Sequence, residues 1–255
     1  MRSAAATIVF LIASAFPAAA QDCPPCPAPA PSPTPTPEPA WKASFGGGLT
    51  VTGGNSETSS FNIAANVKHD PKQRNVFRFE MLHLQSSEEG ASTADKTQAT
   101  LRDEYTVNGR LFVFGDLSFQ RDEFQRVDYL VAPMVGAGFK LVDETKVLVS
   151  VDAGLGVAFE QLEAQSSTTD FAVRGGERLE WKPTDKTSMF QKATAIWKAN
   201  EFGDAYYRFE VGLATSLARR FELKVSFADD YKTRPATGDL DQHDTSFIVS
   251  LLFKL

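Results

Sequence analysis

The sequence of 255 residues contains little of what identifies a helical membrane protein, a nucleic-acid-binding protein or a disulfide-rich scaffold. After residue 20, no stretch approaches the roughly 18 consecutive apolar residues that a membrane-spanning helix requires, which excludes a helical transporter. Lys and Arg number 26 against 32 Asp and Glu, whereas nucleic-acid binding relies on clustered bases, so no nucleic-acid partner is expected. The 2 Cys cannot hold a disulfide-rich fold together.

Residues 1–20 have the pattern of a secretory signal peptide. Arg2 supplies a short basic region, residues 4–16 form an apolar stretch, and residues 18–20 offer the small side chains of a cleavage site. We expect cleavage before Gln21, so these residues do not belong to the fold.

Residues 21–40 hold nine of the 14 prolines. Such a segment lacks backbone donors and apolar periodicity, so it is predicted to be a disordered, extended tether of polyproline type. Cys23 and Cys26 form a C-x-x-C pair within it, but no βαβ pattern and no second ligand pair accompany them. A surface disulfide or free thiols is the favoured interpretation, and a redox or metal site is the alternative. Peptidoglycan or a periplasmic protein is a candidate partner of this arm.

From residue 41 to residue 255, the apolar residues recur mostly with period two, which indicates strands with one apolar face. No stretch has a convincing helical period, so the domain is predicted to be all-β. The clearest alternating runs are 61–67, 77–81, 147–159, 207–217, 221–227 and 247–255.

Turn-forming residues cut this body into about twelve segments of membrane-strand length. Counted from the first, the even-numbered connections are tight, and one of them is Asn108-Gly109, a hairpin signal because both central residues of its turn need φ > 0. Most odd-numbered connections are longer and more polar, including the ninth, expected near Phe202-Gly203. Short turns at one end and longer loops at the other are typical of outer-membrane barrels with both termini in the periplasm.

A soluble β-sandwich would also alternate, and three details favour a barrel. The segments have roughly ten or more residues, against the usual five or six of globular strands. Aromatic residues such as Trp41, Trp181 and Trp197 lie near predicted strand ends, where they would form interfacial girdles. The polar face carries charges in mid-strand, which suits a lumen. We therefore predict an antiparallel transmembrane β-barrel of about 12 strands over residues 41–255.

The charged side chains of the polar face are expected to line this lumen, with cations and anions interleaved. They are Arg78, Glu80, Arg102, Glu104, Asp116, Asp152, Arg174, Arg178, Lys192, Arg208, Glu210, Glu222 and Lys224.

Three positions fit the predicted register poorly. Pro133, in the sixth predicted strand, lacks a donor for the ladder, which calls for a bulge or a late strand start there. Glu177 would direct its carboxylate at lipid unless a bulge at Gly175-Gly176 resets the register. Asp103 would likewise direct its carboxylate at lipid.

Residues 48–60 read GLTVTGGNSETSS and resemble the first hairpin of the salt-induced outer-membrane protein family, also called domain of unknown function 481. Members typically carry a TGN[ST][DE] turn; this chain has an extra Gly in the turn and ends in Leu255, where many outer-membrane proteins end in Phe. The resemblance implies a β-barrel in a Gram-negative outer membrane, in contact with lipid and lipopolysaccharide, with no established catalytic activity. The last strand looks like a signal for the barrel-assembly machinery.

No catalytic constellation is found, so the chain is not expected to be an enzyme, and no cofactor or metal site is predicted. The histidines His69, His83 and His243 are scattered, and His83 has no serine among its same-face neighbours on its own strand. The Gly run 46–48 precedes no helix and is not a phosphate loop. Acid-rich predicted loops, in which we place Asp122 and Asp204, are interpreted as a solvated rim, with divalent cations bridging to lipopolysaccharide as the alternative.

Two functions remain for a monomeric barrel of this kind. One is a narrow, porin-like passive pore for small polar or ionic solutes. The other is a closed structural barrel, plugged by paired charges, that serves envelope integrity or osmotic and salt adaptation. A soluble periplasmic binding module is a third class.

Overall fold

The computed structural model describes residues 40–53, 59–71, 73–88, 91–123, 125–238 and 240–255. The predicted signal peptide and all but the last residue of the predicted tether lie outside these ranges. In the described part of the chain, no helix is long and apolar enough to cross a membrane.

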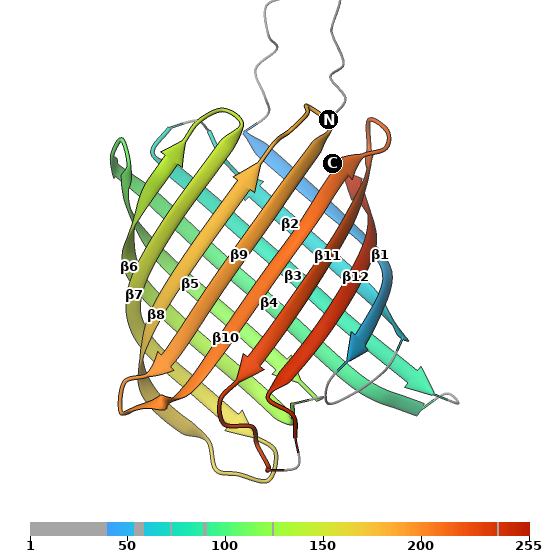
Figure 1. The fold of residues 1–255 in the computed structure, drawn as a ribbon, viewed down its shortest axis with the longest axis vertical. Coiled ribbons are helices and arrows are strands. Elements are labelled where there is room, and N and C mark those ends of the chain that lie inside the picture. The colour runs from blue at the N-terminus through green and yellow to red at the C-terminus, as the bar shows by residue number, and fades with distance from the viewer. Residues whose placement is uncertain (1–39, 54–58, 72, 89–90, 124, 239) are drawn as a thin grey trace, which may run out of the picture. The chain divides into compact units, whose positions relative to one another are not determined.

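Twelve antiparallel strands close into a barrel, in which β1 pairs with β12 and every other strand pairs with its neighbours in sequence (Figure 1). The prediction of an all-β, antiparallel barrel of about 12 strands is thereby confirmed. The strands are β1 (Trp41–Gly53), β2 (Ser59–His69), β3 (Asn75–Glu88), β4 (Ala91–Asn108), β5 (Leu111–Asp122), β6 (Val127–Asp143), β7 (Val147–Leu162), β8 (Thr168–Trp181), β9 (Thr187–Lys198), β10 (Glu201–Ser216), β11 (Phe221–Lys232) and β12 (His243–Lys254).

The period of two in the sequence becomes an outer and an inner face of each strand. On β12, Phe247 and Leu251 are exposed, whereas Ile248 and Leu252, the residues that directly follow them, are buried. A closed barrel with an apolar outer face has no free strand edge and is suited to hydrocarbon rather than water. Exposed apolar side chains surround the barrel and include Trp41, Phe45, Leu49, Phe61, Val135, Leu155, Phe171, Leu213, Phe227, Phe247 and Leu251.

The two ends of the barrel differ in what they carry. We call the end at which β1 begins and β12 ends the turn end, and the opposite end the loop end (Figure 1). Residues 233–242 form a long connection at the loop end, but only residues 199–200 join β9 to β10 there. The predicted contrast between short turns at one end and longer loops at the other therefore does not hold for every connection. Phe202 and Gly203, expected to form the ninth connection, lie instead in β10 beside a register shift.

The hairpin between β4 and β5 closes at Asn108↔Leu111, with Gly109 and Arg110 between them. The position of this hairpin was predicted correctly. The predicted turn with positive φ at Asn108 and Gly109 is not found, because neither residue has a positive φ. A register shift between Thr106 and Asn108 accommodates the strand twist instead.

The bulge expected at Pro133 is absent. The β6–β7 register is the same on both sides of the proline, with Val131 opposite Phe159 and Met134 opposite Gly156. The ladder simply has no pairs at the proline and its predecessor, and the long strands on either side hold the register across this gap.

The bulge expected at Gly175-Gly176 is also absent. The β7–β8 register is continuous from Val147↔Trp181 to Glu160↔Thr168. Glu177 therefore keeps the outward direction that its position in the alternation gives it.

Part of the inner face is apolar, which the prediction of a purely charged lumen did not include. Phe112 and Phe114 of β5 are buried inside, and a Cβ built on Gly138 would lie 2.2 Å from the Phe112 ring. The missing side chains at Gly138 and Gly136 thus let both rings lie against the β6 wall. A second apolar group, at the inner face of β6 to β9, consists of Ala132, Met134, Ala158, Ala172 and Ile196.

Candidate functional site: the charged interior

Each of the thirteen charged residues predicted to line the lumen forms at least one ion pair in the structure. On β3, for example, Arg78 and Glu80 alternate with the outward-facing Phe77 and Phe79, so their side chains enter the barrel. The pairs are Arg78–Glu104, Glu80–Lys192, Arg102 with Glu104, Asp116 and Asp152, Arg174–Asp152, Arg178–Glu180, Arg208–Asp230, Glu210–Lys224 and Glu222–Lys254.

One of these pairs crosses the barrel. Glu80 projects from β3 and Lys192 from β9, and these strands lie on opposite walls of the twelve-strand order. The Lys192 ammonium nevertheless hydrogen-bonds the Glu80 carboxylate directly. Only long side chains that reach the middle of the lumen from both walls can meet in this way, so the passage narrows at this level.

Arg102 organises a second group of charges, on the inner face of β4 to β8. Its guanidinium lies 2.7 Å from Glu104 Oε1, 2.9 Å from Asp152 Oδ2 and 3.9 Å from the centre of the Phe114 ring. Arg174 pairs with the same Asp152 carboxylate. Because buried charges are stable only when paired, this arrangement fixes the direction of both arginines.

The loop-end cluster, which we define as Lys96, Gln98, Asp122, Tyr206 and Asp230, lies in the interior near the loop end. Lys96 Nζ lies 2.7 Å from Asp122 Oδ2 and 2.7 Å from Asp230 Oδ2. The Asp230 carboxylate also accepts hydrogen bonds from Tyr206 Oη and Gln98 Nε2. The side chains of Lys96 and Asp122 are 3% and 0% exposed, so water does not reach them.

A neighbouring network links three more strands at the same end. Glu160 of β7 accepts from Lys198 of β9, at 2.7 Å, and from Lys232 of β11. Lys198 also lies 2.6 Å from Asp204. Asp122 and Asp204 had been expected in a solvated acidic rim, and that expectation was wrong because their strands continue beyond the predicted boundaries. Extending the period-two alternation from the mid-strand charges to the strand ends would have placed Asp122 and Asp204 inside the barrel.

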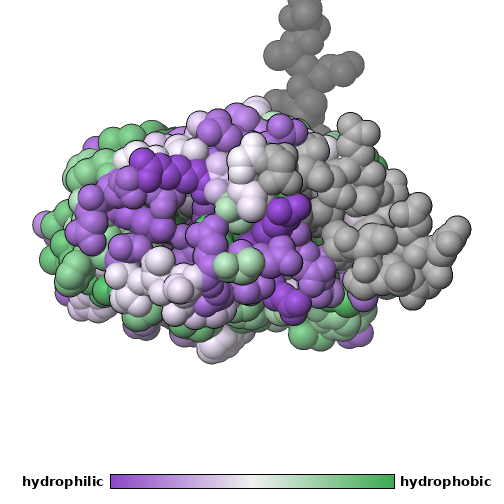
Figure 2. All heavy atoms as spheres, turned by 90° about the horizontal axis from the view of Figure 1, so that it is seen from below, coloured by the Kyte–Doolittle hydropathy of each residue, from purple (hydrophilic) through white to green (hydrophobic). Residues whose placement is uncertain are grey.

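Between these layers the interior keeps two hollows, of about 120 Å³ and about 80 Å³. At the level of the hollows, Glu80 is 35% and Lys192 23% exposed, whereas Arg102 and Asp116 beside them are only 5% exposed. Lys68 and Lys254, nearer the turn end, are also partly open to solvent. In the part of the loop end that Figure 2 colours, hydrophilic residues gather across the middle and apolar residues at the periphery.

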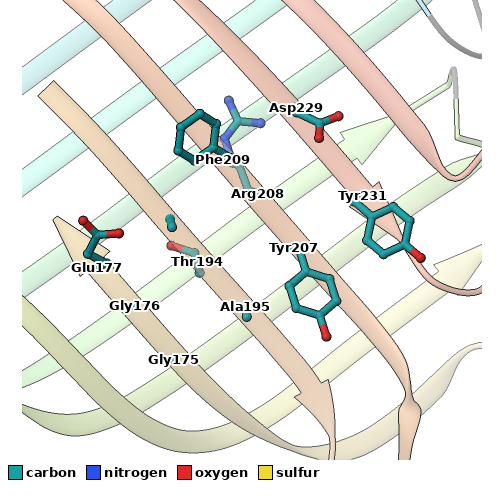
Figure 3. A pocket seen from close by; sticks show the side chains of 11 residues that line it. Gly175, Gly176, Glu177, Thr194, Ala195, Tyr207, Arg208, Phe209, Asp229 and Tyr231 are labelled. Carbon is teal, nitrogen blue, oxygen red and sulfur yellow. The ribbon is translucent and has the colours of Figure 1, made fainter.

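A separate hollow of about 350 Å³ lies on the outer face, where small side chains of β8 and β9 form its floor (Figure 3). Glu177 and Asp229 stand on either side of it, and the rings of Tyr207 and Tyr231 lie next to each other, with their centres 5.7 Å apart. Glu177 accepts hydrogen bonds from Gln191 Nε2 at 3.2 and 3.3 Å, which partly compensates for its outward position.

The three histidines remain apart on the outer face. The structure brings Thr97 of β4 to His83, with Thr97 Oγ1 2.9 Å from Nδ1, a hydroxyl that inspection of the His83 strand alone had missed. Asp95 lies 3.5 Å from the same nitrogen, so the three groups do not form a nucleophile–base–acid line. His69 stacks on Trp41 at the turn end. Across the described residues, no three His, Cys, Asp or Glu side chains converge as metal ligands.

Solved structures similar to this chain are barrels. The NanC porin is 11% identical with a TM-score of 0.53, over 84% of this chain and 100% of that chain. The KdgM porin in complex with disordered oligogalacturonate is 8% identical (TM-score 0.47, 83% and 98% covered), and the anion-selective porin from Comamonas acidovorans is 6% identical (TM-score 0.45, 84% and 98% covered). At such identities the likeness to NanC concerns the fold alone, that of an outer-membrane β-barrel.

No curated protein matches the chain. The family model described as "Protein of unknown function, DUF481" matches residues 46–255, which include nearly all of the barrel. The predicted family is thereby confirmed, and the chain belongs to the DUF481 family.

Proposed function

We propose that this protein is a monomeric outer-membrane pore for small ions, narrow along its length and closed at its loop end by the loop-end cluster. The observation that carries this proposal is the contrast in solvent exposure between the Glu80–Lys192 pair and the loop-end cluster. Glu80 is 35% exposed at mid-height, whereas Asp122 in the loop-end cluster is 0% exposed. Such a gradient is expected of a lumen that opens at one end and is blocked at the other by side chains.

The orientation follows from how outer-membrane barrels are built. Their termini and short turns lie in the periplasm, and their loops face outward. The loop-end cluster would then separate the lumen from the outside, where the loops meet lipopolysaccharide. Side-chain ion pairs suit a gate, because each bond can break without unfolding a strand.

Planar-bilayer recording of the folded, full-length mature chain tests the proposal. We expect rare, small conductance steps from the wild type. The variant Asp230→Asn removes the charge that pairs with both Lys96 and Arg208, so we expect larger or more frequent steps. Asp143→Asn, at an exposed pair with Lys140, is the matched control and should behave as the wild type.

A closed structural barrel is the second candidate, favoured by the contact of Glu80 with Lys192 from the opposite wall. In that case the wild type and Asp230→Asn are both electrically silent, although both show the heat-modifiable gel migration of folded barrels. That outcome would overturn the pore and leave the structural role.

A further inference from the structure

The hollow of about 120 Å³ at mid-height is lined mainly by cations. Three carboxylates, Glu80, Asp116 and Glu210, also line it, together with the hydroxyls of Thr100 and Thr194. The six cationic side chains around it are Arg78, Arg102, Arg174, Arg178, Lys192 and Arg208.

The carboxylates that neutralise several of these arginines lie outside the lining. Arg174 pairs with Asp152 and Arg208 with Asp230, and neither of these carboxylates contributes to the wall of the hollow. A guanidinium has five N–H donors in a planar fork. Each arginine can therefore hold a carboxylate behind it and still present N–H groups to the hollow.

Two of the carboxylates that line the hollow already accept hydrogen bonds from lysines. Glu80 accepts from Lys192, and Glu210 accepts from Lys224 at 3.2 Å. Their negative charge is thus compensated locally, and the arginines determine the character of the remaining surface.

Arg78 has two unmet donor atoms at this place. Its side chain is 8% exposed, and Nη1 lies 2.6 Å from Glu104 Oε2. Neither Nε nor Nη1 makes a hydrogen bond of good geometry to the described residues. A buried donor of a charged group without an acceptor is costly, so an acceptor that the chain itself does not supply would be stabilising here.

We propose that this hollow is a binding site for a small tetrahedral oxyanion of the phosphate or sulfate class, with the Arg78 guanidinium among its donors. A hollow of this size accommodates a few water molecules or one such ion. Several guanidinium groups that converge from different walls match an ion with four acceptor oxygens better than a single-atom anion such as chloride.

The anion would enter from the turn end and pass the partly exposed Lys192 and Glu80, which border the hollow at mid-height. The inference requires this access but not conduction through the loop end. Binding is measured without a membrane potential, so it can fail while the pore stands, and the pore can fail while binding stands.

Equilibrium dialysis of the folded, full-length mature chain in detergent with radiolabelled inorganic phosphate, in chloride of constant ionic strength, tests the site. We expect saturable binding at one site per chain, displaced by sulfate. Arg78→Gln should weaken binding about tenfold or more, since it removes charge-assisted hydrogen bonds. Arg121→Gln, at an exposed pair with Glu123 outside the hollow, should bind as the wild type.

Arg78→Lys keeps the charge but lacks the planar guanidinium donors. It is the second test variant if Arg78→Gln does not migrate as a folded barrel. It should also bind phosphate several-fold more weakly. The proposal is overturned if the wild type shows no saturable phosphate binding above the chloride background. It is equally overturned if folded Arg78→Lys binds as tightly as the wild type.

Discussion

Glu177 is a carboxylate on the outer face of the barrel, and replacing it should stabilise the protein in a bilayer. Its cross-strand neighbours are Val151 on β7 and Ala193 on β9, so no cation faces it from the adjacent strands. A cation on the lipid face of such a barrel costs about 2–4 kcal/mol at mid-membrane, and a carboxylate costs less. The hydrogen bonds from Gln191 reduce this cost further. We take the net cost of the Glu177 charge on the lipid face as about 1 kcal/mol.

Three substitutions separate the charge from the hydrogen bonds. Glu177→Gln removes the charge and keeps the shape, so the free energy of unfolding should rise by about 1 kcal/mol. Glu177→Leu also leaves the Gln191 amide without its acceptor, which costs about 1 kcal/mol, so its net effect should be near zero. The double variant Glu177→Leu with Gln191→Leu should be about 2 kcal/mol more stable than the wild type.

Equilibrium urea unfolding in vesicles of zwitterionic lipid, followed by tryptophan fluorescence, measures these differences. Trp41 and Trp181 lie exposed on the outer surface and report on the transfer from lipid to water. If Glu177→Gln were less stable than the wild type by about 1 kcal/mol or more, the carboxylate would bind a cation or a partner. Our account of the outer face would then be refuted.

Two further stability predictions use the same titration. Asp152→Asn leaves two buried guanidinium groups short of a counter-charge and should cost about 2–3 kcal/mol, whereas Asp143→Asn at an exposed pair should cost less than about 0.5 kcal/mol; equal losses would contradict a buried role for Asp152. Gly138→Ala places a methyl group against the Phe112 ring and should cost about 1–3 kcal/mol, whereas Gly115→Ala meets open space and should be neutral or slightly stabilising. Equal effects of the two alanines would refute the packing described for that ring.

The side on which each residue lies could be predicted from the sequence, because a strand has a strict period of two and the outer face is apolar. The same count placed Arg78 and Glu80 together on the polar face. It could not reveal that Glu80 meets Lys192, since residues 112 positions apart are brought together only when the barrel closes. The contact depends on which wall each strand occupies, which is not a local property.

The errors came from local rules applied to strands with two neighbours. A proline or a glycine pair predicts a bulge when a strand is considered alone, but the ladders on both sides keep Pro133 and Gly175 in register. Strand ends were placed too early where polar residues follow one another, so Asp122 was assigned to a loop although it is buried inside. Polarity does not distinguish a solvated loop from the inner wall of a barrel.

The central claim is that the lumen opens at the turn end and is shut at the loop end. Its most direct test is a cysteine at Thr194, which lines the mid-height hollow, in a background with Cys23 and Cys26 replaced by serine. Gly109→Cys at the turn end and Glu163→Cys at the loop end mark the two sides.

In sealed proteoliposomes, a small membrane-impermeant thiol reagent added outside labels the fraction of each marker that faces outward. We expect Thr194→Cys to be labelled to the same fraction as Gly109→Cys, and to be labelled completely once Asp230→Asn is added. Labelling that instead follows Glu163→Cys, or that is complete without Asp230→Asn, would contradict the account.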